Sequence, residues 1–421
     1  MSIASTFNHT GLIESGGQAL RARIGALADQ CVKCGLCQPQ CPTYAVARQE
    51  AESPRGRIAL AATLALGNLD AGGTVSAATH LDNCLACMRC ERVCPSQVRY
   101  GELIVATRDL LRRTAPAAAP SRLGWWLAHP RWLRRLLRAA NLPLLRQCIQ
   151  SRALRGLWQR FGLARAVAEL PRVPPLPATG AQRVAVAARG RVGLFLGCVA
   201  STADRDVHAA ARRLLAALGH EVVEPDGQAC CGALPLHGGD VAGAEALAAP
   251  TRRAFAAANV DTVLVSASGC FGTLRDVTFA GAAIRVREIH EFLDADAQFA
   301  ALKFQALSRR IAVHTPCTQS NVARAEAAVL RLLRHIPQLD IVELPPQPGC
   351  CGAAGDYFLR HAATADALRA EKLDQAMKVE TDMLVTSNVG CRIFLDNGLR
   401  QRGARMPVVH PVALLAQQLD N

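Results

Sequence analysis

The sequence predicts an α+β multidomain protein, with an α-helical N-terminal domain, a basic helical linker and two repeated parallel α/β domains. Three observations predict it: two groups of four closely spaced cysteines in the first hundred residues, a following segment rich in arginine and tryptophan, and an internal repeat that fills the rest. We place the four parts at residues 1–107, 108–185, 186–303 and 304–421. A chain of 421 residues, half of them apolar, is long enough for several packed cores.

The cysteine content indicates a reducing compartment. Seventeen cysteines would suggest disulfides in a short secreted chain, but this chain is long and its first ten residues have no basic region followed by an apolar run. We therefore expect a cytoplasmic protein in which clustered thiols bind metal. No run of about 18 apolar residues appears, so any membrane contact is expected to be peripheral, on the cytoplasmic face of the inner membrane.

The two N-terminal cysteine groups have the spacing of iron-sulfur ligands. C-V-K-C-G-L-C-Q-P-Q-C-P begins at Cys31 and C-L-A-C-M-R-C-E-R-V-C-P begins at Cys84. Both match the C-x2-C-x2-C-x3-C-P run, in which the fourth cysteine ligates the neighbouring cluster. The sequence thus predicts two [4Fe-4S] clusters, the first held by Cys31, Cys34, Cys37 and Cys94 and the second by Cys84, Cys87, Cys90 and Cys41. Zinc is the alternative, but four-coordinate zinc has no need of two interlocked runs that each end in proline.

A helix is expected between the two cysteine runs. Ser53 is suited to cap its start, Pro54 to occupy its first turn and Gly67 to end it. Arg55 and Arg57 on this helix either stabilise the negative clusters or are ordinary solvated charges.

The linker carries most of the net charge of +14. Residues 108–172 contain fourteen Arg against Asp109 and Glu169, a surplus of +12, and also hold all four Trp (Trp125, Trp126, Trp132 and Trp158). Interleaved apolar and basic residues are typical of an amphipathic helix on an anionic membrane. The alternative is a helical connector that packs over the clusters or against a partner subunit, and it ends in the proline-rich stretch P-R-V-P-P-L-P-A-T-G. No recognition helix or RNA-binding signature appears, so we expect no nucleic acid partner.

The C-terminal half is an internal repeat. Four features recur at separations of 119, 120, 121 and 120 residues: Cys198 and Cys317, Cys230-Cys231-Gly232 and Cys350-Cys351-Gly352, Cys270 and Cys391, and His290 and His410. Strands and helices alternate in each half, which predicts parallel α/β units with the cysteines beyond the carboxyl ends of the strands. We expect the halves to face each other as pseudo-symmetric partners.

Each half therefore offers a set of metal ligands. The sets are Cys198, Cys230, Cys231 and Cys270 in the first half and Cys317, Cys350, Cys351 and Cys391 in the second. The alternative is burial of reduced cysteine as a small apolar residue. Cys148, His290 and His410 are expected to be packing residues rather than ligands.

At these motifs the chain resembles the cysteine-rich CCG-domain proteins, and especially the iron-sulfur subunits of bacterial glycolate oxidases. The resemblance rests on E-S-P-R-G-R-I, C-M-R-C-E-R-V-C-P-S-Q, A-C-C-G-A-L-P-L-H-G-G-D and G-C-C-G-A-A-G-D-Y-F. It implies an electron-transfer subunit that passes electrons from a flavin-containing 2-hydroxy acid dehydrogenase subunit towards quinone or another respiratory acceptor. The chain has no G-x-G-x-x-G opening a helix after a strand and no P-loop, so oxidation of glycolate to glyoxylate is expected on the partner, with no catalytic residue here.

One departure from the family motif leaves the cluster count open. Cys270 and Cys391 are not followed by a further C-x-x-C cysteine, so each half has four cysteines rather than five. One cluster in each half, one shared cluster, or a cluster in only one half would all be consistent with this. The alternative functions are a heterodisulfide reductase-like subunit and the iron-sulfur subunit of a lactate or glycerol 3-phosphate dehydrogenase.

Overall fold

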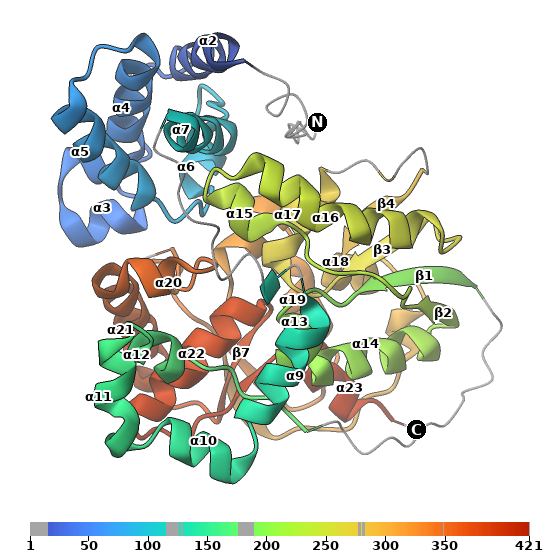
Figure 1. Ribbon diagram of the computed structural model, residues 1–421. Helices are drawn as coiled ribbons and strands as arrows, with labels where there is room; N and C mark the ends of the chain where they lie inside the picture. The colour runs from blue at the N-terminus through green and yellow to red at the C-terminus, as the bar shows by residue number, and fades with distance from the viewer. Residues whose placement is uncertain are drawn as a thin grey trace.

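The structure is a computed structural model that describes residues 16–114, 126–127, 129–175, 189–276, 279, 283–347 and 349–420. The first ten residues, Trp125 and the end of the proline-rich stretch (176–180), all considered above, lie outside the described residues. The predicted fold class is confirmed: a helical N-terminal domain, linker helices and two parallel α/β domains follow one another along the chain (Figure 1).

The N-terminal domain is a group of helices around an apolar core. The expected helix between the cysteine runs is α4, in which the Ser53 hydroxyl accepts a hydrogen bond from the Gly56 N–H and Gly67 ends the helix at a positive φ of 74°. Leu20, Ile24 and Leu103 are fully buried between the helices. The helices are α2 (Gly17–Ala28), α3 (Pro42–Ala47), η1 (Glu50–Glu52), α4 (Pro54–Leu66), α5 (Ala71–Asp82), α6 (Arg89–Arg92) and α7 (Tyr100–Thr114).

Helix α7 runs through residue 107, where we placed the first boundary. Its Leu103, Ile104 and Leu110 belong to the N-terminal core, so the start of the basic segment is part of that domain. The helices of the linker that follows are α9 (Pro130–Ala140), α10 (Pro143–Ile149), α11 (Arg152–Arg160) and α12 (Ala164–Ala168).

Each α/β domain contains a four-stranded parallel sheet with the same strand order. The orders are β2-β1-β3-β4 and β6-β5-β7-β8, so the second sheet repeats the first. The elements of the first domain are β1 (Gly190–Phe195), α13 (Ala200–Ala203), α14 (Arg205–Ala217), β2 (His220–Val223), α15 (Ala233–His237), α16 (Val241–Ala256), β3 (Thr262–Val265), α17 (Ser268–Arg275), β4 (Arg285–Glu288), α18 (Ile289–Asp294) and η2 (Phe299–Ala301). Those of the second are β5 (Arg309–His314), η3 (Gln319–Ala323), α19 (Glu326–Leu333), β6 (Leu339–Glu343), α20 (Tyr357–Arg360), α21 (Ala362–Lys378), β7 (Met383–Thr386), α22 (Val389–Gln401), β8 (Val408–Val409) and α23 (Pro411–Gln418).

The two α/β domains exchange their last helices, as the predicted pseudo-symmetry requires. Helix α18 of the first domain packs on α19 of the second, and α23 of the second packs on α14 of the first. One apolar core therefore runs through both domains. His290 and His410, both fully buried, stack on each other with ring centroids 5.3 Å apart. They are packing residues at this junction, as expected.

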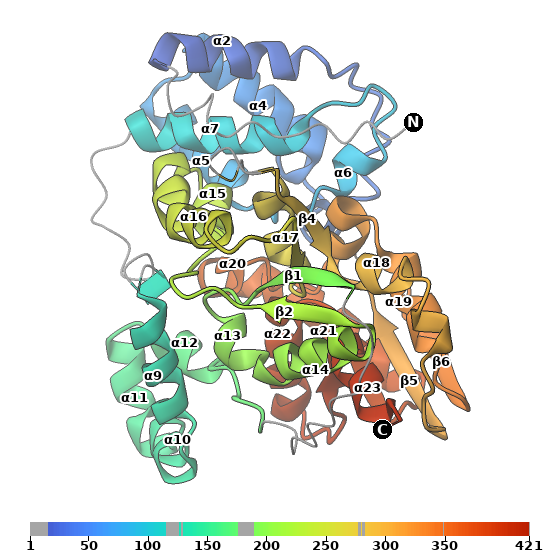
Figure 2. The same ribbon diagram turned by 90° about the vertical axis from the view of Figure 1, so that its right-hand side faces the viewer.

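The N-terminal domain lies over one end of the α/β pair, and the linker helices stand along its side (Figure 2). Arg92 donates a hydrogen bond to Glu326 in the second α/β domain, and the Tyr357 hydroxyl contacts Asn83 in the N-terminal domain. These contacts place the second cysteine run beside the second repeat.

Candidate iron-sulfur sites

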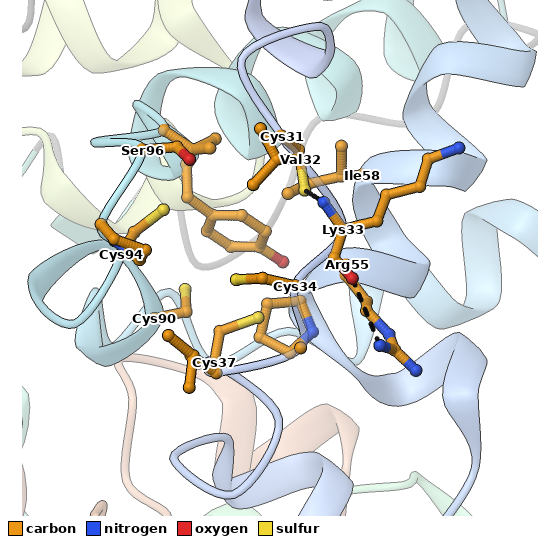
Figure 3. A pocket seen from close by; sticks show the side chains of 16 residues that line it. Cys31, Val32, Lys33, Cys34, Cys37, Arg55, Ile58, Cys90, Cys94 and Ser96 are labelled. Carbon is orange, nitrogen blue, oxygen red and sulfur yellow. Dashed lines mark hydrogen bonds between the residues drawn. The ribbon is translucent and has the colours of Figure 1, made fainter.

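The first cluster site is a pocket lined by Cys31, Cys34, Cys37 and Cys94 (Figure 3). The loop of the first three cysteines turns tightly because Lys33 and Gly35 have positive φ values of 58° and 85°. The Lys33 N–H donates to Cys31 Sγ at 3.4 Å, so a backbone donor already faces a thiol. The structure brings together the four cysteines that the sequence assigns to the first cluster.

The second cluster site is a pocket lined by Cys41, Cys84, Cys87 and Cys90. The Ala86 N–H donates to Cys84 Sγ at 3.5 Å. Cys90 lines the first pocket as well. The two sites therefore adjoin, and Cys41 and Cys94 have crossed over between the runs as the motif predicts.

A buried arginine faces the second site. Arg57 is 1% exposed and donates hydrogen bonds to Thr43 Oγ1 at 2.9 Å and to the His80 carbonyl at 2.7 Å. Its Nη1 lies 3.9 Å from Cys41 Sγ, and its other end pairs with Glu52. Of the two roles considered for Arg57, that of a solvated surface charge is wrong. A guanidinium held this close to the thiolates offsets the negative charge that four thiolates and a cluster bring into a buried site.

The thiols of the second site differ in their electrostatics. Burial raises the pKa of Cys84, but the guanidinium groups of Arg57 and Arg108 outweigh it and hold that pKa below its usual value. The pKa of Cys87 is raised by burial and further by the neighbouring Cys350. Cys87 and Cys350 belong to the same buried apolar cluster, so Cys87 lies beside a cysteine of the second repeat.

The Cys-Cys-Gly turns have the same geometry in both repeats. Gly232 and Gly352 have φ values of 81° and 89°. A Cβ added to Gly232 would lie 2.5 Å from the Ala244 carbonyl oxygen, and one added to Gly352 would lie 2.4 Å from the Ala365 carbonyl oxygen. Only glycine fits there, because the backbone conformation and the helix behind it both exclude a side chain. Each glycine N–H donates to the first cysteine of its turn at 3.4 Å.

In both repeats the four cysteines form a connected group. Cys351 donates to Cys391 Sγ at 3.1 Å. Hydrogen bonds from Cys317 and Cys351 hold the pKa of Cys350 well below its usual value, and those from Cys198 and Cys231 act in the same way on Cys230. The structure thus assembles both sets of four that the repeat predicted, namely Cys198, Cys230, Cys231 and Cys270, and Cys317, Cys350, Cys351 and Cys391.

The site of the second repeat is continuous with the second cluster site. Leu85 and Cys87 share an apolar cluster with Cys350, Cys351 and Cys391. Asn321 donates to the Cys87 carbonyl at 2.8 Å. The two groups of cysteines are therefore neighbours across the domain boundary.

The site of the first repeat is covered by the linker instead. Leu133 and Leu137 of α9, together with Leu127, pack on Cys198 and Cys230. The expectation that the apolar side of this helix lies on a membrane is wrong for Leu133 and Leu137, since both are buried against the first α/β domain. The connector that we considered as the alternative thus packs over cysteines of the first repeat.

Two charged residues at the sites were not found from the sequence. Arg108, counted in the basic surplus, is 6% exposed and donates to the carbonyls of Leu81 and Cys84. Lys372 is 3% exposed and donates to the Gln347 carbonyl at 2.7 Å. Gln347 lies two residues before Gly349, beside the second Cys-Cys-Gly turn. The sequence around each of these residues is typical of a protein surface, so their burial is seen only in the three-dimensional contacts.

The donor sets fit iron-sulfur clusters. Each N-terminal pocket gathers at least four thiols from the two cysteine runs, with backbone N–H groups directed at sulfur. Thiolate is the ligand that iron-sulfur clusters take. Among the described residues, no group of three or more histidine, cysteine or acidic side chains is arranged to hold a single metal ion.

Comparison with known proteins identifies the same parts. A model described as "4Fe-4S dicluster domain" matches residues 27–98, and one described as "Cysteine-rich domain" matches residues 192–275 and 311–396. Both kinds of domain that the cysteine spacings predicted are therefore matched in this chain. The matches lie inside the N-terminal domain and the two repeats.

Relatives extend the likeness over the whole chain. The chain is 29% identical to the "Probable glycolate oxidase iron-sulfur subunit" of Bacillus subtilis, over 92% of this chain and 93% of that one. It is 29% identical to the "Glycolate oxidase iron-sulfur subunit" of Escherichia coli, over 98% and 99%. The "Lactate utilization protein A" of Geobacillus kaustophilus is 27% identical over 53% of this chain and 98% of its own. The predicted resemblance is confirmed, and an iron-sulfur electron-transfer role is supported.

The structure also bears on membrane insertion. In the described part of the chain, none of the helices has both the length and the apolar character needed to span a bilayer.

Proposed function

We propose that this chain is the electron-transfer subunit of a flavin-dependent 2-hydroxy acid dehydrogenase that oxidises glycolate to glyoxylate on a partner subunit. The proposal is carried by one observation: three groups of cysteines adjoin in a row. Cys90 lines both cluster pockets, and Cys87 packs with Cys350 of the second repeat. The two relatives that match nearly the whole chain are named as glycolate oxidase iron-sulfur subunits.

In this proposal the first and second cluster sites each hold a [4Fe-4S] cluster. Cys31, Cys34, Cys37 and Cys94 are the ligands at the first, and Cys84, Cys87, Cys90 and Cys41 those at the second. Such clusters carry one electron at a time, whereas oxidation of a 2-hydroxy acid releases two, so a partner flavin has to divide the pair.

Electrons enter at the first site. Cys34 is exposed there, and Val32 and Leu36 beside it are 69% and 59% exposed. An accessible thiolate loop ringed by apolar side chains suits the docking of the flavin subunit. The electron passes next to the second site, where Arg57 and Arg108 hold positive charge. From there the path continues through the adjoining thiols of Cys87 and Cys350.

The second repeat receives the electron in this scheme. Its four cysteines hold the further cluster, and Lys372 and Arg89 supply positive charge near Cys350 and Cys317. The four cysteines of the first repeat serve packing under the linker. Quinone or another respiratory acceptor takes the electron from the second repeat.

The linker brings the complex to the membrane surface. Its exposed apolar side chains include Trp132, Leu136 and Leu144, at 54%, 45% and 79% exposure, and Arg135 lies over the Trp132 ring. Arginine and tryptophan together suit an anionic membrane interface. Sedimentation with anionic liposomes should weaken when Arg134, Arg135 and Arg138 are neutralised, and an unchanged sedimentation would remove this part of the proposal.

The function is tested by adding substrate to the complex that co-purifies with this chain under anaerobic conditions. Glycolate should bleach the visible absorbance of the clusters, because electrons reach them from the flavin. Bleaching by lactate and not by glycolate would indicate that the complex is a lactate dehydrogenase instead. The name of one relative, "Lactate utilization protein A", suggests that function. No bleaching by either acid, in a complex whose flavin is reduced, would contradict it.

A further inference from the structure

A cavity outside the cysteine sites lies between the linker and the second α/β domain. It has a volume of about 360 Å³ and lies between helices α10, α11 and α12 on one side and α22 on the other. We call it the linker pocket. Its polar lining includes Arg155, Arg172, Arg400, Asn397 and Gln401. None of the described residues that line it is acidic.

The arginines at the linker pocket repel one another. Burial lowers the pKa of Arg146 to about 10, and the positive charges of Arg400 and Arg172 lower it further. Arg400 pairs with Asp396 at 2.7 Å. Arg155 and Arg172 have no acidic group within ion-pair distance in the described part of the chain. The pocket therefore carries an excess of positive charge that a bound anion would offset.

A buried amide at the same place lacks an acceptor. Asn397 is 3% exposed, and its Oδ1 accepts a hydrogen bond from Arg400. Its Nδ2 is buried and has no hydrogen-bond partner among the described residues. A buried donor that is left unpaired lowers the stability of the folded chain. This unpaired donor belongs to a residue that lines the pocket.

We propose that the linker pocket binds a phosphate group. Guanidinium groups bind phosphate oxygens with paired hydrogen bonds, and a dianion matches two arginines without acidic partners better than a single carboxylate does. The phosphate comes either from a free phosphate compound or from the headgroup of an anionic lipid. A lipid headgroup is consistent with the exposed apolar side chains nearby, namely Leu144 on α10 and Phe161 directly after α11, at 79% and 64% exposure. This site does not depend on the iron-sulfur chemistry.

The proposal is tested with the full chain, by equilibrium dialysis against radiolabelled inorganic phosphate at fixed ionic strength. Arg172→Gln removes an exposed arginine of the pocket and should weaken phosphate binding about tenfold, the loss of one charge-assisted hydrogen bond. Arg160→Gln is the matched control, since Arg160 is exposed on α11 but does not line the pocket. A second arm compares flotation with vesicles of phosphatidylglycerol and of phosphatidylcholine.

The two arms separate the sources. Phosphate binding that falls in Arg172→Gln and not in Arg160→Gln, without any vesicle binding, supports a free phosphate compound. Binding to phosphatidylglycerol vesicles that inorganic phosphate competes away, and that Arg172→Gln weakens, supports a lipid headgroup. Equal behaviour of the two variants in both arms, or no binding in either, overturns the proposal whether or not the chain transfers electrons.

Discussion

The two α/β domains have the same strand order and the same four cysteines, but their cysteine sites face different neighbours. In the second repeat, Cys350 packs beside Cys87 of the second cluster site. In the first repeat, Cys230 lies beneath Leu133 and Leu137 of the linker. A repeat therefore fixes the geometry of a site, while the elements packed on it determine which side chains lie next to that site.

The charges around the cysteines of the two repeats also differ. Lys372 is buried beside the second Cys-Cys-Gly turn and donates to backbone carbonyls there. At the corresponding position of the first repeat, 121 residues earlier, the buried and uncharged Thr251 donates to the Cys230 carbonyl at 3.1 Å. The second repeat thus places a cation where a negative cluster would gain from it, and the first does not.

The largest expected difference between the repeats is in turnover. Cys350→Ser should lower glycolate-dependent reduction of the acceptor by the assembled complex at least about a hundredfold, because it removes a ligand beside Cys87. The matched variant Cys230→Ser should lower it less than about threefold. Steady-state rates, with iron measured in each preparation, distinguish the two. Equal losses would show that both repeats belong to the electron path.

The glycine of the Cys-Cys-Gly turn is a feature that the two repeats share. Gly352→Ala and Gly232→Ala each force a side chain into a left-handed backbone conformation and against a helix carbonyl. We expect each to lower the free energy of unfolding by about 2–4 kcal/mol, and by the same amount within error. Denaturant unfolding of the two variants measures this. A large difference would mean that the turns are not equivalent.

The cover over the first site can be tested by thiol reactivity. Leu137→Ala should destabilise the chain by about 2–3 kcal/mol and should speed alkylation of Cys198 and Cys230, because the leucine is buried over them. Cys350 and Cys351 should react as before. Leu136→Ala is the control, since Leu136 is 45% exposed on the same helix. Unchanged alkylation of Cys230 in the first variant would contradict the cover.

The smallest effect is the pH dependence that one buried histidine of the second repeat, His314, adds to the stability of the chain. Burial lowers the pKa of His314, with help from Lys372, to about 3, and the matching residue of the first repeat is Phe195. Below its unfolded pKa near 6.5, the unfolded chain binds a proton that the folded chain does not. His314 should therefore reduce stability by about 1.4 kcal/mol for each pH unit below 6.5.

The variant His314→Phe tests that prediction by giving the second repeat the residue of the first. Its unfolding free energy should fall less steeply than that of the unchanged chain between pH 6.5 and 5.5. Identical slopes would show that His314 is not held neutral. The other buried histidines are present in both proteins and do not affect the difference.

Local sequence signals predicted much of this molecule. Ser53 and Gly67 fixed the ends of α4 because a capping hydroxyl and a left-handed glycine act within one turn of the helix. The cysteine spacings predicted which thiols would meet, since short loops leave few alternatives. The repeat offsets predicted two equal sheets.

Long-range packing was not predictable in the same way. Arg108 and Leu137 belong to a segment that reads as a surface, and their burial depends on which domain the linker crosses. The exchange of α18 and α23 between the repeats leaves no local pattern. The different surroundings of Cys230 and Cys350 leave no local pattern either. Both cysteines stand in the same motif, and only the elements packed on them differ.

The central claim is that fixed groups of thiolates hold iron for electron transfer. It is tested most directly by measuring iron, acid-labile sulfide and the EPR spectrum of the chain purified without oxygen and then reduced. The account predicts about eight irons and eight sulfides per chain from the two N-terminal clusters, with the spectrum of two interacting clusters, and additional iron and sulfide from the cluster of the second repeat. Fewer than about eight irons in a preparation that still supports full turnover of its complex would contradict it.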